Sequence, residues 1–353
     1  MTGSRPAATA RSGTSADSIA WIPDSFVPPW WLAGTHLQTL MGKFLRSASY
    51  REFTRERIEL PDGDFLDLDW TPETNPLSPL VLLLHGLEGH TSRGYVLQAC
   101  QTLAKQDMRA VALNFRGCSG ESNRTPRFYH SGETGDIGIV ITHLRKRFPN
   151  RPIMAMGFSL GGNILLKFLG ERSVAGETPV SAAVAVSVPY DLSAGADTLE
   201  IGLMARLYTW YFVRSLRAKV RAKQDSLRDT IDLDAARSSS TIREFDNAVT
   251  APLHGFRDAE DYYHKSSSKK FLSTIRVPTL LVHSLDDPFL PSSAIPVQEV
   301  ETNPYLTLVV TERGGHMGFI QNASSPVSSF WLEEQTSAFL THFRRKSAGG
   351  PGN

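Results

Sequence analysis

Cysteine, surplus charge and long apolar runs are all scarce in this chain of 353 residues. Only Cys100 and Cys118 are present, which excludes a disulfide framework and predicts two reduced thiols. Lysine and arginine number 37 against 36 acidic residues, so the net charge of +1 gives no electrostatic footprint for nucleic acid. The longest purely apolar stretch, Leu80–Leu84, is too short for a transmembrane helix.

Several functional motifs are also missing. The chain has no His-Glu-x-x-His, no Cys-x-x-Cys and no Walker-type glycine loop, so we expect neither a metal nor another cofactor. Its first 18 residues lack the apolar core of a secretory signal, which favours a cytoplasmic protein. We expect a disordered tail over 1–20 and a flexible tail over 346–353.

From residue 80 onward, apolar runs typical of strands alternate with segments that have helical spacing. This alternation is typical of a parallel α/β sheet with helices on both faces. Strands are expected at 80–84, 109–115, 153–158, 180–188, 279–284 and 307–311, and helices at 95–106, 135–147, 160–169, from 291 and at 330–344. The stretch 56–70 predicts a hairpin, and the aromatic arm 21–39 should pack on the domain. The alternation breaks over 192–270. This segment predicts a helical lid inserted into a core of 21–191 and 271–345.

The most informative motif is Gly157-Phe158-Ser159-Leu160-Gly161. Gly-x-Ser-x-Gly arises by chance, but here an expected strand ends at Phe158 and a helix begins at Leu160. That context is a nucleophile elbow, in which a tight turn exposes the serine oxygen above the sheet. Ser159 is therefore the candidate nucleophile. A plain strand-to-helix turn of small residues is the alternative.

A nucleophilic serine needs a base and a group that orients it. The base is predicted to be His316, on a glycine-rich loop after a late strand, where open α/β sheets place their sites. The alternative bases are His254, His264 and His283. Asp286 and Asp287 both follow the strand 279–284, and sequence alone does not separate them. We prefer Asp287, because relatives of this fold usually carry the acid at that place in the loop.

Two backbone amides are candidates for an oxyanion hole. His85-Gly86-Leu87-Glu88-Gly89 follows the strand 80–84, where the fold supplies one such amide. The second comes from the residue after the nucleophile. We assign the N–H groups of Leu87 and Leu160. A tight turn without that role is the alternative reading of His85-Gly86.

Several motifs in the same order resemble the YheT-like α/β-hydrolases over about residues 26–343. They are Leu84–Gly89, Asn114–Gly120, Tyr129–Thr134, Gly157–Asn163 and Arg243–Asp246. The resemblance implies a serine carboxylesterase that acts on a small-molecule acyl ester or lipid. It carries Ser159, Asp287 and His316 over as the catalytic triad. An acyltransferase with the same triad and an alcohol acceptor, and a non-catalytic binding protein, are the alternatives.

The predicted lid includes a basic helix without acidic residues between Ile201 and Gln224. At helical spacing its arginines 206, 214, 217 and 221 share one face with Trp210. This face is either a solvated surface over a packed lid or a weak contact with anionic lipid headgroups, which would make the protein peripheral at the membrane. We expect Leu203, Leu207 and Tyr211 to set acyl-chain preference, with the arm 26–31 as the alternative. The sequence does not indicate an oligomeric state.

Overall fold

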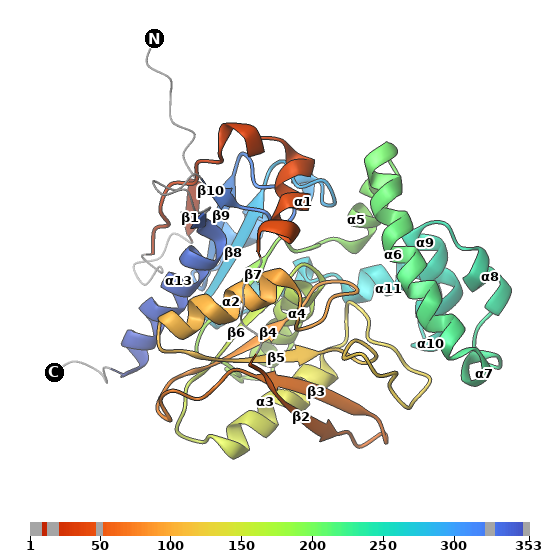
Figure 1. Cartoon of the computed structure of the whole chain (residues 1–353), viewed down its shortest axis with the longest axis horizontal. Coiled ribbons are helices and arrows are strands. Elements are labelled where there is room, and N and C mark those ends of the chain that lie inside the picture. Colours follow the sequence, from red (N-terminus) through yellow and green to blue (C-terminus); the bar gives the residue numbers. More distant parts are fainter. Residues whose placement is uncertain (1–8, 13–20, 47–51, 322–328, 349–353) are drawn as a thin grey trace, which may run out of the picture.

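The computed structural model describes residues 9–12, 21–46, 52–321 and 329–348. Nine strands of this part form one sheet in the order β1-β9-β8-β7-β6-β4-β5-β3-β2 (Figure 1). Their bounds are β1 Thr9–Ser12, β2 Thr54–Glu59, β3 Phe65–Trp70, β4 Leu80–Leu84, β5 Arg109–Asn114, β6 Ile153–Phe158, β7 Ala183–Val186, β8 Thr279–Ser284 and β9 Leu306–Thr311. Strands β4 to β9 pair in parallel, and β1, β2 and β3 pair antiparallel to their neighbours. The predicted fold class is confirmed.

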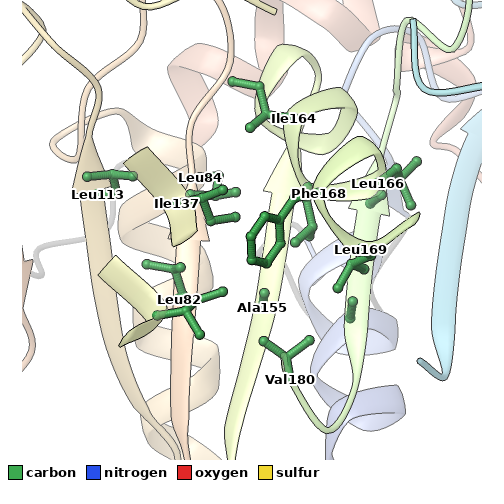
Figure 2. Close-up of a cluster of buried hydrophobic side chains, with 14 of the residues drawn as sticks. Leu82, Leu84, Leu113, Ile137, Ala155, Ile164, Leu166, Phe168, Leu169 and Val180 are labelled. Carbon is green, nitrogen blue, oxygen red and sulfur yellow. The ribbon is translucent and has the colours of Figure 1, made fainter. Parts of the chain in front are cut away.

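Helices cover both faces of the sheet. One face packs against α3 (Gly135–Arg147), α4 (Leu160–Val174) and α12 (Val297–Glu301). The other packs against α2 (Gly94–Lys105) and α13 (Trp331–Ala348). Figure 2 shows Phe168 and Leu169 of α4 packed against the side chains of the central strands. Because both faces are covered, β4 is apolar at every position and fully buried.

The chain between β7 and β8 is helical and lies to one side of the sheet (Figure 1, green to cyan). Its α-helices are α5 Leu192–Thr198, α6 Leu203–Ala222, α7 Gln224–Leu227, α8 Leu233–Ser238, α9 Ile242–Phe245, α10 Ala251–Leu253 and α11 Ala259–Ser266, with a π-helical turn at Asp246–Thr250 and a 3-10 helix at Lys269–Thr274. Part of this helical insertion has a small apolar core of its own, built around Val220, Leu227, Phe245 and Val249. Within the described residues, no helix is both long and apolar enough to cross a bilayer.

Parts of the two predicted tails have regular secondary structure. Thr9–Ser12 pairs with β9 as an edge strand, because the outer N–H and C=O groups of β9 would otherwise lack partners. The rest of the predicted N-terminal tail, 1–8 and 13–20, lies outside the described residues. Helix α13 continues to Ala348, so 346–348 are helical, and 349–353 lie outside the described residues.

Two further expectations need correction. Phe26 of the aromatic arm is buried against Trp331 and Phe319, at ring distances of 5.3 and 5.9 Å, but Trp30 is 88% exposed. The helix expected from residue 291 is a short 3-10 turn, Ser292–Ala294, followed by α12. Pro296 separates them, since proline has no N–H to continue a helix.

Candidate active site

Ser159 occupies the sharp turn between β6 and α4. Its backbone has φ 52° and ψ −120°, a conformation that costs a non-glycine residue about 1–3 kcal/mol. The glycines on either side make the turn possible. A Cβ on Gly157 would lie 2.5 Å from the carbonyl oxygen of Gly161, and one on Gly161 would lie 2.5 Å from the carbonyl oxygens of Leu84 and His85. The sequence therefore folds here into a turn that presents the serine hydroxyl.

The structure brings Ser159, His316 and Asp287 together. Nε2 of His316 lies 3.0 Å from Oγ of Ser159, and Nδ1 lies 2.8 Å from Oδ2 of Asp287. The side chain of Asp287 is fully buried, and its Oδ1 accepts a hydrogen bond of 2.9 Å from the Phe289 N–H. With a proton on Nδ1 held by this carboxylate, Nε2 is free to accept the serine proton.

The neighbouring Asp286 points elsewhere. Its Oδ1 accepts from the Gly315 N–H at 2.9 Å, and its Oδ2 accepts from the Thr35 hydroxyl at 3.0 Å. Asp286 therefore anchors the loop that carries His316, while Asp287 contacts the imidazole itself.

Helix α1 (Thr35–Leu45) braces the His316 loop, a feature that the sequence analysis did not anticipate. The Thr39 hydroxyl accepts from the His316 N–H at 2.9 Å. Arg46, which follows α1, donates to the carbonyl oxygens of Met317 and Gly318 and forms a buried ion pair with Glu333. These partners come from distant parts of the chain, so no local sequence signal reveals them.

The predicted oxyanion loop lies beside the serine. A Cβ on Gly86 would be 3.2 Å from Cβ of Ser159. Neither Leu87 nor Leu160 donates its amide to another group in the described part of the chain. His85 accepts from the Phe115 N–H through Nε2, and its Nδ1 faces the Gly86 carbonyl oxygen at 2.8 Å. Burial lowers the pKa of His85 to about 3, so it is a neutral structural residue that holds the loop to Phe115, the residue after β5.

Glu88 connects this loop to the helical insertion, a role that its place in the sequence does not indicate. Its φ is 52°, and its N–H donates to the Tyr129 hydroxyl at 2.8 Å. Its carboxylate accepts from Tyr129 and from Ser215 and Lys219 of α6, with the Lys219 ammonium at 2.8 Å. Burial lowers the pKa of Lys219, but nearby Cys118 and Glu88 outweigh this effect and raise it. The Lys219 ammonium of α6 thus holds Glu88, the residue after Leu87, in place.

An apolar pocket opens from Ser159 toward the helical insertion, with an empty volume of about 1100 Å³ that includes its mouth. Its apolar lining includes Leu87, Leu160, Leu192, Leu199, Phe212, Leu216, Ile242, Phe245, Val249, Leu253, Phe289 and Leu290. A second recess reaches Ser159 from the side of α1, and its empty volume of about 810 Å³ also includes its mouth. Two open spaces therefore meet at the serine.

Several sequence-predicted residues lie away from this pocket. Leu203 and Leu207 line neither space, and Tyr211 lines only the recess beside α1. The pocket uses the opposite side of α6, through Phe212 and Leu216. The arm 26–31 does not line it either.

The rival histidines also differ from His316. His283 is buried within β8, and neither ring nitrogen has a hydrogen-bond partner among the described residues. His254 lines the pocket and lies against His130, with 4.4 Å between ring centres and the rings tilted by 47°. Over the described residues, no group of three or more His, Cys, Asp or Glu side chains is arranged to hold a metal ion.

Comparison with known proteins gives strong matches in sequence. The α/β hydrolase fold family matches residues 79–323. The protein named "Putative esterase YheT" of Escherichia coli is 38% identical over 323 residues, which are 90% of this chain and 93% of that protein. "Phospholipase ABHD3" of Mus musculus is 33% identical over 86% of this chain and 75% of its own length. "Monoacylglycerol lipase" of Saccharomyces cerevisiae is 35% identical over 75% of this chain and 59% of its own length.

Solved structures share the fold at low sequence identity. The Pyrococcus furiosus esterase Pf2001 superposes with a TM-score of 0.55 at 16% identity, over 92% of this chain and 97% of that one. Est1E from Butyrivibrio proteoclasticus superposes with a TM-score of 0.52 at 14% identity, over 84% of this chain and 99% of that one. At this identity the likeness shows the fold alone.

Proposed function

Because this chain belongs to the α/β-hydrolase fold family, among the esterase- and lipase-type proteins similar to YheT, we propose that it is a serine carboxylesterase. The proposed triad is Ser159, His316 and Asp287. The observation that supports it is the continuous hydrogen-bonded chain from the serine hydroxyl through the imidazole to a buried carboxylate. The family resemblance noted in the sequence is confirmed, and the catalytic roles are our proposal.

The proposed reaction has two halves. His316 removes the proton from Ser159 as the serine oxygen attacks the ester carbonyl, and Asp287 stabilises the resulting imidazolium. The amides of Leu87 and Leu160 stabilise the developing oxyanion, where one donor typically contributes about 3–4 kcal/mol. The imidazolium then protonates the leaving alcohol, and an acyl group remains on Ser159. Water, deprotonated by His316, attacks this acyl-enzyme and releases the acid.

The pocket supports an ester with an apolar acyl chain as the substrate. Its walls are predominantly aliphatic and aromatic, and they begin at the reacting serine. Three relatives carry the names of an esterase, a phospholipase and a monoacylglycerol lipase. We propose that the acyl chain lies between α4 and the helical insertion, and that the alcohol part faces the recess beside α1.

Hydrolysis of a p-nitrophenyl ester series, from acetate to palmitate, tests this function. We expect turnover by the wild-type protein, with a preferred chain length, and a loss of several orders of magnitude in Ser159→Ala. Turnover that persists in Ser159→Ala would contradict the proposal. Product analysis with added ethanol distinguishes hydrolysis from transfer to an alcohol.

A further inference from the structure

In helix α1 the polar face points inward and the apolar face points outward, the reverse of an ordinary surface helix. Its inward face is polar: Gln38 is fully buried and exchanges two hydrogen bonds with the backbone of Ile320, and Thr39 holds the His316 N–H. Its outward face carries Leu37, Leu40 and Phe44, which are spaced as one helical stripe. A helix that only packs on its own domain turns such a stripe inward.

Helix α6 carries a second exposed apolar stripe. Leu203, Leu207 and Trp210 share one face of this helix, and the exposed fractions of the six side chains in the two stripes run from 38% at Leu40 to 85% at Leu203. We call these six side chains the α1–α6 apolar surface. Exposed apolar groups gathered in this way are typical of an interaction site.

The two helices contact each other at the entrance to the candidate active site. Nδ1 of His36 lies 3.2 Å from the Tyr208 hydroxyl, and the Lys43 ammonium lies 5.1 Å from the centre of the Tyr211 ring. The recess that reaches Ser159 is lined by α1 on one side and by α6 on the other. In Figure 1, α1 lies at the top of the molecule and α6 lies to its right. The apolar surface therefore borders a route to the serine.

Charge indicates what covers this surface. Neither α1 nor α6 contains an acidic residue, whereas α6 carries four arginines at helical spacing with Trp210, at positions 206, 214, 217 and 221. Its fifth basic residue, Lys219, points inward to Glu88. Arg214 lies over the Trp210 ring at 5.3 Å, which places a cation beside an exposed aromatic group. Basic and aromatic side chains around an apolar face match an anionic bilayer, in which headgroups bind the cations and acyl chains receive the apolar groups.

We propose that the α1–α6 apolar surface docks on an anionic lipid bilayer and turns the recess that leads to Ser159 toward the lipid. A water-exposed apolar rim at the entrance then has a function, because a substrate ester enters from the membrane without crossing bulk water. The polar inner face of α1 keeps the His316 loop in place, while its outer face binds the lipid. Docking requires no turnover, so it stands or falls separately from the esterase proposal.

Vesicle co-sedimentation of the full chain tests the proposal. Vesicles of phosphatidylcholine alone are compared with vesicles that also contain phosphatidylglycerol, at low salt. We expect the wild-type protein to bind the anionic vesicles at least about tenfold more tightly. We expect Leu40→Ser/Phe44→Ser and, independently, Leu203→Ser/Leu207→Ser to weaken binding about tenfold or more. The matched control is Leu77→Ser, which changes an 80%-exposed leucine outside both helices.

Circular dichroism and turnover of p-nitrophenyl acetate, a soluble ester, show whether the variants are folded. Equal binding of the wild-type protein to both vesicle types would overturn the proposal. So would unchanged binding by both double variants, or an equal loss in Leu77→Ser. Analytical ultracentrifugation tests the other possible occupant of the surface, a second copy of the chain. A wild-type dimer that the Leu40→Ser/Phe44→Ser variant converts to monomer would assign the surface to a second copy of the chain and also overturn the proposal.

Discussion

Replacing Asp287 by asparagine tests the proposed role of the buried carboxylate with almost no change in shape. The Phe289 N–H donates to Oδ1 of Asp287, so an asparagine there keeps its oxygen on that side. Its NH₂ group then faces Nδ1 of His316, which has to become a hydrogen-bond acceptor. The proton moves to Nε2, and the imidazole no longer accepts the proton of Ser159.

In Ser-His-Asp triads, holding the histidine in the wrong tautomer is known to lower kcat strongly. We expect kcat of Asp287→Asn to fall by about 10⁴-fold, which corresponds to about 5 kcal/mol of activation free energy. KM and the melting temperature should change little, since the side-chain volume and the Phe289 hydrogen bond are kept. The assay is steady-state hydrolysis of p-nitrophenyl butyrate, with the melting temperature measured by circular dichroism.

Asp286→Asn is the matched control one residue away. It weakens one of the contacts to Gly315 and Thr35, so we expect a loss of about 1 kcal/mol in unfolding free energy and a kcat within about tenfold of the wild type. The reasoning is refuted if Asp287→Asn keeps most of its kcat. It is also refuted if Asp286→Asn loses as much kcat while its melting temperature is unchanged.

Three other predictions concern the surroundings of the site. Leu216→Trp should fill part of the pocket and shift the p-nitrophenyl ester optimum to shorter chains, whereas Leu207→Trp should not, and equal shifts would contradict the assigned lining. Lys219→Met removes the ammonium from the Glu88 carboxylate and should lower kcat roughly tenfold with little change in KM, because the oxyanion loop loses support. Lys223→Met, which loosens α6 one turn further on, is the control, and equal effects would point to helix stability alone. Burial raises the pKa of Asp246 from 3.8 to about 6, so the folded state holds the proton more tightly than the unfolded state does. The contribution of Asp246 to the unfolding free energy should therefore fall by about 2 kcal/mol as the pH rises from about 4 to about 6. It is measured as the difference between wild type and Asp246→Asn in urea titrations, and a difference that does not change with pH would contradict this assignment.

Local pattern made much of the fold predictable. The apolar run of β4 and the alternation that follows it predict a parallel sheet, because each element repeats its own spacing over enough residues. The elbow at Ser159 was equally predictable from the sequence, since the glycines that its turn requires stand two residues away on either side. The chain order of serine, acid and histidine then restricted the other candidates to two short loops.

Features that depend on distant contacts were not predictable. Asp286 and Asp287 are adjacent, and which one faces His316 depends on where the Thr35 hydroxyl and the Gly315 amide lie. The rotation of α6 was a similar problem. That helix carries apolar side chains on more than one face, so its spacing does not indicate that Phe212 rather than Leu207 lines the pocket.

Covalent labelling of Ser159 tests the central claim most directly. A fluorophosphonate probe reacts with an activated serine, and mass spectrometry of the digested protein locates the modified residue. We predict stoichiometric labelling on the peptide that contains Ser159, and no labelling of a folded Ser159→Ala variant. A wild-type protein that stays unlabelled, or a probe attached to any other residue, would contradict the assignment of Ser159 as the nucleophile.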